Sequence, residues 1–477
     1  MKQSLPTPRR TTATWLTVVL LLAGCASGAK PDGQLPATPT PGKWSTSVSE
    51  ALPGQPTGTL AAWWNNFNDP QLTELVALAL QANTDIRSAQ FALQQARALR
   101  DVAAANRLPT VSASASAQGA TTFNTDTTTN TYKAGFDASW EPDVFGAKRS
   151  ALSATEADAE AAAANLAQIR VSMAAEVAVT YIELRGLQAR LAIARNNLAS
   201  QNETRQITAW RNQAGLASSL DLEQAISAAE QTRAQIPSLE TSLRQNMNQL
   251  AVLTGQAPGV LQHKLATPVA IPQAAQTLAV AFPAETLRQR PDVRTAEHRI
   301  NAALARVAQA DAARYPSFKL SGSLGLNASR LEDFTSGTAL VRTLLASVTG
   351  PLFDAGAAQA QVRAQTAALE QARVSYEAAV LTALQDVENA LVALQGNRER
   401  VLRLQAAADA AANADLLARH RYASGLIDFR SVLETQRTLL STQDSLETTR
   451  ATLSADHVRL YKALGGGWTP DNPGAQP

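Results

Sequence analysis

The side chains that most often carry catalysis or bind metals are few and scattered in this 477-residue sequence. Four histidines, His263, His298, His420 and His457, lie far apart and lack the spacing of metal ligands. We find no nucleophile elbow, phosphate-binding loop or serine–histidine–aspartate combination. Isolated carboxylates on long polar helices are typical of solvated surfaces. The sequence therefore does not support an enzyme, and a hydrolytic lipoprotein lacks the residues it would need.

The one thiol of the chain, Cys25, lies at the end of a short apolar run. Lys2, Arg9 and Arg10 precede the run, Thr14 to Ala23, which is too short to span a bilayer and is typical of a secretory signal peptide. The sequence Leu-Ala-Gly-Cys that ends at Cys25 resembles the bacterial lipobox. That resemblance implies cleavage before Cys25 and attachment of an N-acyl chain and an S-diacylglycerol group. Because Ala26 follows instead of Asp, the analogy implies sorting to the outer membrane.

Net charge and cysteine content argue against a nucleic-acid partner and against disulfide bonds. Removing three basic residues with the signal peptide leaves 39 basic against 40 acidic residues, so the mature chain has no nucleic-acid footprint. A single cysteine also excludes disulfides within the chain. No cofactor is expected beyond the lipid on Cys25. Residues 26 to about 60 are rich in Pro, Gly, Thr and Ser, which is typical of a tether or an extended strap.

One long stretch, Gly146 to Gly255, is repeated from Gly356 to Gly465 at a constant offset of 210 residues. Upstream the offset is 207, and the three extra residues of the second copy lie in an expected surface loop before Gly356. We therefore predict an internal duplication with this organisation: signal peptide 1–24, lipidated strap 25–62, first repeat 63–255, irregular linker 256–283, second repeat 284–466 and disordered tail 467–477.

In each repeat, the first of two long segments has the periodicity of an α-helix. No proline occurs between Pro142 and Pro237, and a helix from about Ala147 to Asn212 would be roughly 100 Å long. Gly215 and Gly425 stand where a short turn to a return helix is needed. A further helical segment is expected from Pro70 to about Asn106. Apolar residues form one stripe along the first long helix: Leu166, Ile169, Met173, Val177, Tyr181, Leu184, Leu187 and Leu191.

In two segments the apolar residues alternate with a period of two instead of a helical period, and these segments decide the fold class. Hairpins are predicted at about 110–141, with a Thr/Asn-rich loop at Thr121–Thr131, and at about 317–350. The last strand, about Leu340–Thr349, alternates less cleanly because Arg342 shares a face with Leu344 and Val348. Strands of this length with one apolar face suit a transmembrane barrel. An ordinary soluble hairpin packed on a helix fits the pattern too, but the export signal favours the membrane.

Four strands per chain have a physical consequence in lipid. Open sheet edges are not viable in the hydrocarbon region, and barrels begin at about eight strands. A barrel built from this chain must therefore be shared between chains. The predicted fold class is mainly α with a transmembrane β part, in which a ring of chains continues the pore as a tube of helices.

Five blocks of the sequence, taken together and in order, resemble the outer membrane factor family of TolC-like channels, and specifically the lipoprotein branch that serves drug-efflux pumps. They are Trp63-Trp64-Asn65-Asn66-Phe67-Asn68-Asp69-Pro70-Gln71-Leu72, Arg290-Pro291-Asp292-Val293-Arg294, Ala313-Arg314-Tyr315-Pro316, Pro351-Leu352-Phe353-Asp354-Ala355-Gly356 and Asp386-Val387-Glu388-Asn389-Ala390-Leu391. The Ile236-Pro237 step inside the return helix also looks like a feature of this branch.

The resemblance implies a homotrimer with a 12-stranded β-barrel, a long α-helical periplasmic barrel and a mixed equatorial girdle. It implies a passive exit duct for drugs and small molecules, partnered by a periplasmic adaptor (membrane fusion protein) and an inner-membrane transporter of the resistance-nodulation-division type. The adaptor would contact the helix turns at Arg211, Gly215, Leu216, Ser219, Asp221, Arg421, Gly425 and Leu426. The gate would involve Tyr422, Asp428, Arg430, Glu434 and Arg437.

One gate position departs from the family pattern. Arg430 stands where an apolar side chain is commonly seen, so a charged constriction with Glu434 or Asp428 as partner is expected instead, and its closure would depend on salt. Three alternatives stay open: a type I secretion duct, a metal-efflux duct, or a structural periplasmic lipoprotein without a pore. No Met- or His-rich stretch points to metals, and a coiled-coil spacer would leave the paired hairpins unexplained.

Overall fold

The computed structural model describes residues 35–36, 41–42, 44–45, 58–122, 127–274, 287, 289–335 and 340–468. Cys25 and the signal peptide lie outside the described residues, as do most of the strap and the end of the tail. The chain divides into two compact units. One, which contains the sheet, includes Ala103–Ala154 and Asn301–Glu370. The other, called the helical unit from here on, contains Pro36–Val102, Thr155–Ile300 and Gln371–Pro477.

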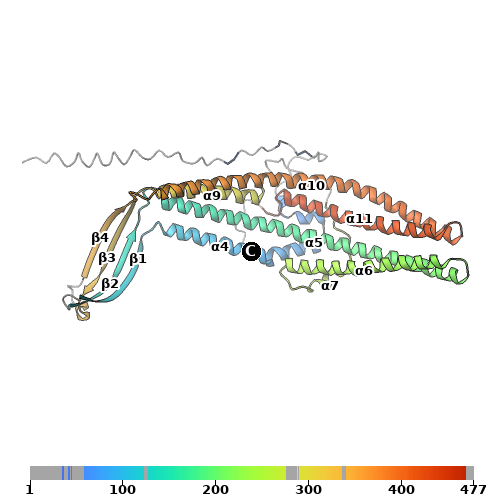
Figure 1. Ribbon diagram of the computed structural model, residues 1–477, viewed down its shortest axis with the longest axis horizontal. Helices are drawn as coiled ribbons and strands as arrows, with labels where there is room; N and C mark the ends of the chain where they lie inside the picture. The colour runs from blue at the N-terminus through green and yellow to red at the C-terminus, as the bar shows by residue number, and fades with distance from the viewer. Residues whose placement is uncertain are drawn as a thin grey trace, which may run out of the picture. The chain divides into compact units, whose positions relative to one another are not determined.

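The described elements repeat in length as well as in sequence (Figure 1). Helix α5 and its counterpart α10 each have 67 residues, and α6 and α11 each have 35. In chain order the elements are α2 (Gly58–Ala61), η2 (Trp63–Phe67), α3 (Pro70–Ala82), α4 (Thr84–Ala105), β1 (Thr110–Thr122), β2 (Thr127–Trp140), α5 (Ala147–Gln213), α6 (Ser219–Leu253), α7 (Gln262–Leu265), α9 (Pro291–Ala312), β3 (Ser317–Ala328), η3 (Leu331–Thr335), β4 (Leu340–Thr349), α10 (Ala357–Ala423) and α11 (Phe429–Ala463).

The helical segment expected from Pro70 to about Asn106 is confirmed, and one local prediction was wrong. The segment contains two helices, because Asn83 has extended backbone and caps the second one: its Oδ1 accepts from the Asp85 and Ile86 amides at 2.8 and 3.3 Å. The loop expected at Thr121–Thr131 is shorter, since the strands continue pairing until Thr122 lies opposite Thr127. The expected helix α5 and the expected strand β4 are confirmed.

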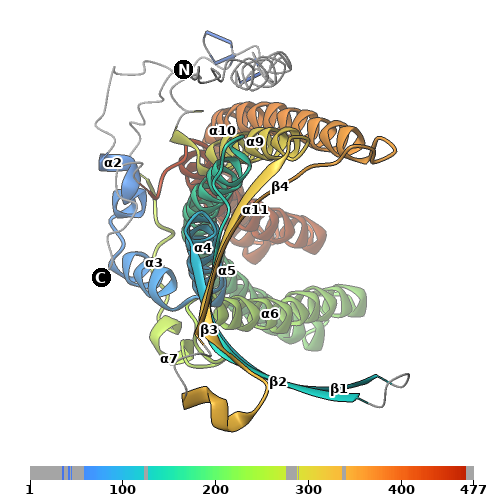
Figure 2. The same ribbon diagram turned by 90° about the vertical axis from the view of Figure 1, so that its left-hand side faces the viewer.

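The four strands form one antiparallel sheet in the order β1-β2-β3-β4, which curves along this order in Figure 2. Its register places the residues of the predicted apolar face opposite one another: Val111 faces Ala138, and Phe136 faces Leu324. Arg342 lies opposite Leu324 and so belongs to the same face, as predicted. In the described part of the chain, no helix is both long enough and apolar enough to cross a membrane.

The first of the five sequence blocks that resemble the channel family, Trp63 to Leu72, contributes to a core cluster of the helical unit. Trp63 is fully buried and stacks on Tyr461, with ring centroids 5.3 Å apart. Asp69 caps α3 by accepting from the Gln71 and Leu72 amides, and its second oxygen accepts from the Tyr181 hydroxyl at 2.9 Å. Burial raises the pKa of Tyr181 to about 12, so its hydroxyl keeps this hydrogen bond at any physiological pH. The block therefore ties the start of the repeat to α5 and α11.

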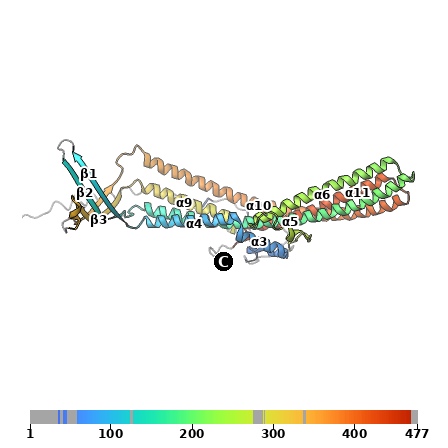
Figure 3. The same cartoon turned by 90° about the horizontal axis from the view of Figure 1, so that it is seen from below.

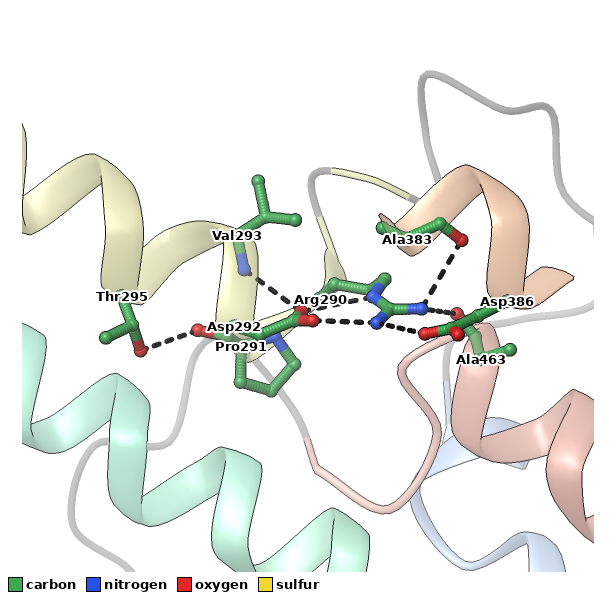
Figure 4. A network of polar contacts seen from close by, with 8 residues as sticks. All are labelled: Arg290, Pro291, Asp292, Val293, Thr295, Ala383, Asp386 and Ala463. Atoms are coloured by element: carbon green, nitrogen blue, oxygen red, sulfur yellow. Dashed lines mark hydrogen bonds and ion pairs between the residues drawn. The ribbon is translucent and has the colours of Figure 1, made fainter. Parts of the chain in front are cut away.

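The second family block centres on a buried arginine (Figure 4). The Arg290 guanidinium donates to Asp292 at 2.7 Å, to Asp386 at 2.9 Å and to the Ala463 carbonyl at 3.0 Å. Burial alone would lower the pKa of Arg290, but the two carboxylates outweigh it and the pKa is raised. One side chain thus joins the start of α9 to α10 and to the end of α11.

The first repeat makes the same connection with a neutral side chain. Asn83 stands 207 residues before Arg290, and its amide nitrogen donates to the Leu253 carbonyl at 2.9 Å. Leu253 is the counterpart of Ala463 at the offset of 210. Both copies therefore fasten the start of the helix that precedes the strands, α4 or α9, to the last residue of the return helix.

Two glycines set the closest approach between strands. A Cβ added at Gly135 would lie 2.7 Å from the Gly325 Cα, and one added at Gly325 would lie 2.6 Å from the Ala134 carbonyl oxygen. Since both obstacles are backbone atoms, a side chain at either position must push β2 and β3 apart.

We expect Gly135→Ala to lower stability by about 1–3 kcal/mol, measured by thermal unfolding in detergent. The control is Gly322→Ala, whose Cβ would make an ordinary 3.5 Å contact with the Thr343 oxygen; equal melting of the two variants would refute the prediction.

Removing the Arg290 guanidinium should destabilise the helical unit. Arg290→Met would remove the guanidinium from the Ala463 carbonyl and from the Asp292 and Asp386 carboxylates. We expect a loss of about 3 kcal/mol, the low end for breaking a buried ion pair, because Asp386 is half exposed and Asp292 keeps its bond from the Val293 amide. Arg403→Met is the control: its side chain is 82% exposed and pairs with Glu399 at 3.5 Å, so its effect should be within about 0.5 kcal/mol. Chemical unfolding monitored by circular dichroism measures both, and a loss at Arg290 no larger than the control's would contradict the assignment.

Candidate functional site

The two helix turns lie at the same end of the helical unit (Figure 3). One joins α5 to α6 and the other joins α10 to α11. All thirteen residues predicted for the gate and the adaptor contact lie in or near these turns. The structure thus brings together positions that are about 210 residues apart in sequence.

Both turns end their first helix in the same way. Gly215 and Gly425 each have φ +73°, a left-handed conformation that glycine adopts without strain. The Leu216 amide donates to the Arg211 carbonyl at 2.7 Å, and the Leu426 amide donates to the Arg421 carbonyl at 2.9 Å. These are Schellman motifs, and they satisfy the last carbonyls of the long helices. The role of both glycines in the turn is therefore conformational.

The return helices begin with side-chain caps. Ser218 and Asp221 form a reciprocal capping box at the start of α6. Asp428 caps α11 by accepting from the Ser431 amide at 3.0 Å and the Ser431 hydroxyl at 2.5 Å. These bonds hold the pKa of the Asp428 carboxyl below its usual range, with a smaller contribution from Arg430. Sequence reasoning missed Ser218, although the Ser-x-x-Asp spacing is a capping signal.

An arginine connects the two turns. The Arg211 guanidinium donates to the Tyr422 carbonyl at 3.0 Å and lies 4.6 Å from the centre of the Tyr422 ring. The Tyr422 ring also contacts the buried Phe429, with centroids 5.4 Å apart. A cation over an aromatic face gains about 0.5–1 kcal/mol when exposed and more when desolvated. This contact gives Arg211 and Tyr422 a shared role, holding one hairpin against the other.

Other predicted gate residues are exposed and make fewer contacts. Arg430, Glu434 and Arg437 all lie on the exposed side of α11. Among the described residues no ion pair within 4.0 Å joins Arg430 to Glu434 or Asp428 in a single chain. Their proposed ionic constriction stays a prediction. Leu216 and Leu426 are 72% and 74% exposed at the turns, where apolar side chains are available to another protein.

A polar seam above the turns was not foreseen from the sequence. The Asp415 carboxylate is buried, pairs with Arg419 at 2.6 Å, and has its pKa raised by that burial despite the arginine. Arg419 in turn donates to the Ser200 hydroxyl on α5 at 3.0 Å. Nearby, the Gln436 amide donates to the Thr204 hydroxyl at 2.9 Å, joining α11 to α5. The spacing of four residues relates Asp415 to Arg419 on α10. No periodicity rule identifies their partner Ser200 or the Gln436–Thr204 pair, because these contacts join helices from different repeats.

Metal-binding clusters of three or more His, Cys, Asp or Glu residues are absent from the described ranges. His457 is buried with its Nδ1 2.9 Å from the Leu453 carbonyl, and burial lowers its pKa, so the imidazole stays neutral near pH 7. His298 contacts Glu160 at 2.9 Å. These histidines serve packing and surface contacts in the helical unit.

Comparisons with known proteins agree with the geometry. The family model described as outer membrane efflux protein matches residues 75–256 and 282–466, that is, both repeats. Nodulation protein T of Rhizobium leguminosarum bv. trifolii is 30% identical over 94% of this chain and 96% of its own length. The toluene efflux pump outer membrane protein TtgF of Pseudomonas putida is 30% identical over 97% of this chain and 98% of its own length.

Solved structures match over nearly the whole chain. The outer-membrane channel OprN has a TM-score of 0.83 at 34% identity, covering 92% of this chain and 100% of that one. CusC has a TM-score of 0.82 at 27% identity over the same shares. The expected mainly helical fold with a four-stranded antiparallel part is therefore confirmed. The chain belongs to the outer membrane efflux protein family, a family of outer membrane channel proteins.

Proposed function

We propose that three copies of this chain form a passive exit duct of a tripartite efflux pump, carrying small molecules from the periplasm to the exterior. Each copy contributes four strands to a 12-stranded barrel and four long helices to a periplasmic tube. A periplasmic adaptor and an inner-membrane transporter of the resistance-nodulation-division type supply the substrate and the energy. Lipid on Cys25 anchors each copy to the membrane.

The observation that carries this proposal is a difference between equivalent faces of the two repeats. On α5, Ala164, Val171 and Ile182 are 8%, 5% and 0% exposed. Their counterparts on α10, 210 residues later, are Val374, Leu381 and Val392, which are 64%, 51% and 58% exposed. The same stripe is thus covered in the first repeat and left open in the second.

The helix that covers the first stripe identifies what is missing from the second. A Cβ at Gly186 on α5 would lie 2.8 Å from the Ala451 Cβ on α11, so these two helices are in close contact. The counterpart Gly396 on α10 has nothing within 4 Å. The return helix of the next copy, α6, is the counterpart of α11 and fits this open face. Repeating the contact from chain to chain closes a ring and pairs the free edges of β4 and β1.

The turns serve as the gate and as the adaptor contact in this proposal. Arg211 on Tyr422 holds the two hairpins of one chain together, and the exposed Leu216 and Leu426 are offered to the adaptor. The relatives' names support small organic substrates: one is a toluene efflux pump protein and another a pyoverdine export protein.

Native mass spectrometry of the mature, lipidated protein in mild detergent tests the proposal most directly. We expect the mass of three chains, each carrying the lipid of Cys25. A monomer would leave the β1 and β4 edges unpaired in lipid and would overturn the duct. A Cys25→Ala chain should lack the lipid mass and still give a trimer, which separates anchoring from assembly.

Loosening the contact between the hairpins should raise the resting conductance of the channel. Arg211→Gln removes the guanidinium from the Tyr422 ring and carbonyl, which together stabilise closure by about 1–2 kcal/mol. We expect the open probability in planar bilayers to rise about 5–30-fold. Arg205→Gln, on the same helix, is the control and should behave as the unmodified protein. Arg430→Ala and Glu434→Ala in the same assay test the ionic constriction; unchanged conductance would remove both from the gate.

A further inference from the structure

A cleft in the unit that contains the sheet is not used by the proposed duct. Its volume is about 480 Å³, and it lies where the strands meet the helices. The ends of α4 and β2, the starts of β1 and α5, and single positions on α9 and β3 line it. Its lining includes Asn106, Leu108, Trp140, Glu141, Lys148 and Lys319.

The cleft is lined by both polar and apolar side chains. Thr110 lies opposite Ser139, and Ser139 lies opposite Ser321, two residues from Lys319, so these positions share the polar face of the sheet. Trp140 is next to Ser139 and belongs to the apolar face. Its indole N–H donates to the Arg107 carbonyl at 3.1 Å, which fixes the ring beside the cleft.

The charge in the cleft is positive. Lys148 and Lys319 contribute ammonium groups, and Glu141 lies 3.2 Å from the Lys148 Nζ. Lys319 forms no ion pair with any residue in the described ranges and is exposed. The Asn106 and Gln309 amides add neutral hydrogen-bond donors to the lining. An anionic head group would neutralise Lys319 without having to displace another partner.

Apolar side chains gather on the connections between strands and helices. Leu108, in the lining, is 66% exposed. In the connection after β2, Phe145 stacks on Tyr315 with centroids 4.8 Å apart. In the connection after β4, Leu352 and Phe353 are fully or almost fully exposed. Aromatic and basic side chains in this combination are typical of the boundary between membrane and water.

We propose that the cleft binds an anionic amphiphile, whose phosphate, sulfate or carboxylate head pairs with Lys319 and Lys148 while its apolar part lies against Trp140 and Leu108. The ligand has two possible sources: an anionic phospholipid of the membrane, or an anionic amphiphile in transit. The site uses residues of one chain and goes beyond the proposed duct; only the second source, a ligand in transit, rests on the proposed function.

The first test measures binding of phosphatidylglycerol to the full-length mature protein by native mass spectrometry, with phosphatidylcholine for comparison. Lys319→Gln should bind phosphatidylglycerol about tenfold more weakly, the effect of losing one charged contact. Lys319→Arg should retain binding, because it keeps the charge. The matched control is Lys133→Gln, a lysine of the same polar face that lies opposite Asn327 and outside the cleft lining.

The second test separates the sources by using decyl phosphate, a soluble amphiphile. Phospholipid retained through purification by the unmodified protein and lost from Lys319→Gln indicates a membrane ligand. No retained phospholipid, with Lys319-dependent binding of decyl phosphate, indicates a ligand in transit. Equal binding of both ligands by Lys319→Gln and Lys133→Gln overturns the site. The same spectra report the number of chains, so a failure of assembly is distinguishable from a failure of this inference.

Discussion

The unpaired edges of the sheet are the constraint on which this molecule depends. In the described sheet, β1 and β4 each have a neighbour on one side only. A backbone edge exposed to hydrocarbon costs several kcal/mol for each unsatisfied group, and this protein belongs to a family of the outer membrane. The helical unit carries the matching deficit, an apolar stripe on α10 that its own chain leaves open. In the proposed duct, another copy of the same chain covers both the sheet edge and the apolar stripe.

Much of the fold could be predicted because its signals are periodic and long. A helix without proline and with one apolar stripe has little choice of structure, and the expected bounds of α5 differ from the observed ones by one residue. Alternation predicted the faces of the strands, including the unusual position of Arg342. Where a single side chain interrupts a pattern, periodicity did not reveal it: Asn83 divides the expected helical segment by capping its second half.

The candidate site was harder to predict, because its contacts cross between repeats. Glycine spacing located both turns, yet the contact between Arg211 and Tyr422 joins positions that no local rule relates. The same holds for the contact between Arg419 on α10 and Ser200 on α5. Pairwise chemistry of this kind depends on how two helix surfaces meet, and that is fixed only by the folded chain. The roles of Arg430, Glu434 and Arg437 depend further on neighbouring chains and stay predictions.

The duplication also illustrates how one geometry can be held by different chemistry. Asn83 and Arg290 occupy equivalent positions and donate to equivalent carbonyls, of Leu253 and Ala463. Only the second copy uses charge, with Asp292 and Asp386 as partners. In both copies the side chain also reaches the long helix: the Asn83 amide donates to the Met173 sulfur on α5 at 3.2 Å, and the Arg290 guanidinium donates to the Asp386 carboxylate on α10 at 2.9 Å.

The equal lengths of α5 and α10, and of α6 and α11, restrict how such a sequence can evolve. A deletion of one residue in α5 would rotate the rest of that helix by about 100° about its axis. It would also shift the α5–α6 turn along the helix axis relative to the turn after α10. A compensating deletion would then be required at the matching place in the other repeat. Length changes are therefore tolerated only outside these helices. Where the two copies align, the three extra residues of the second copy lie in the segment that contains β3, η3 and β4, where the chain can lengthen without shifting either helix turn.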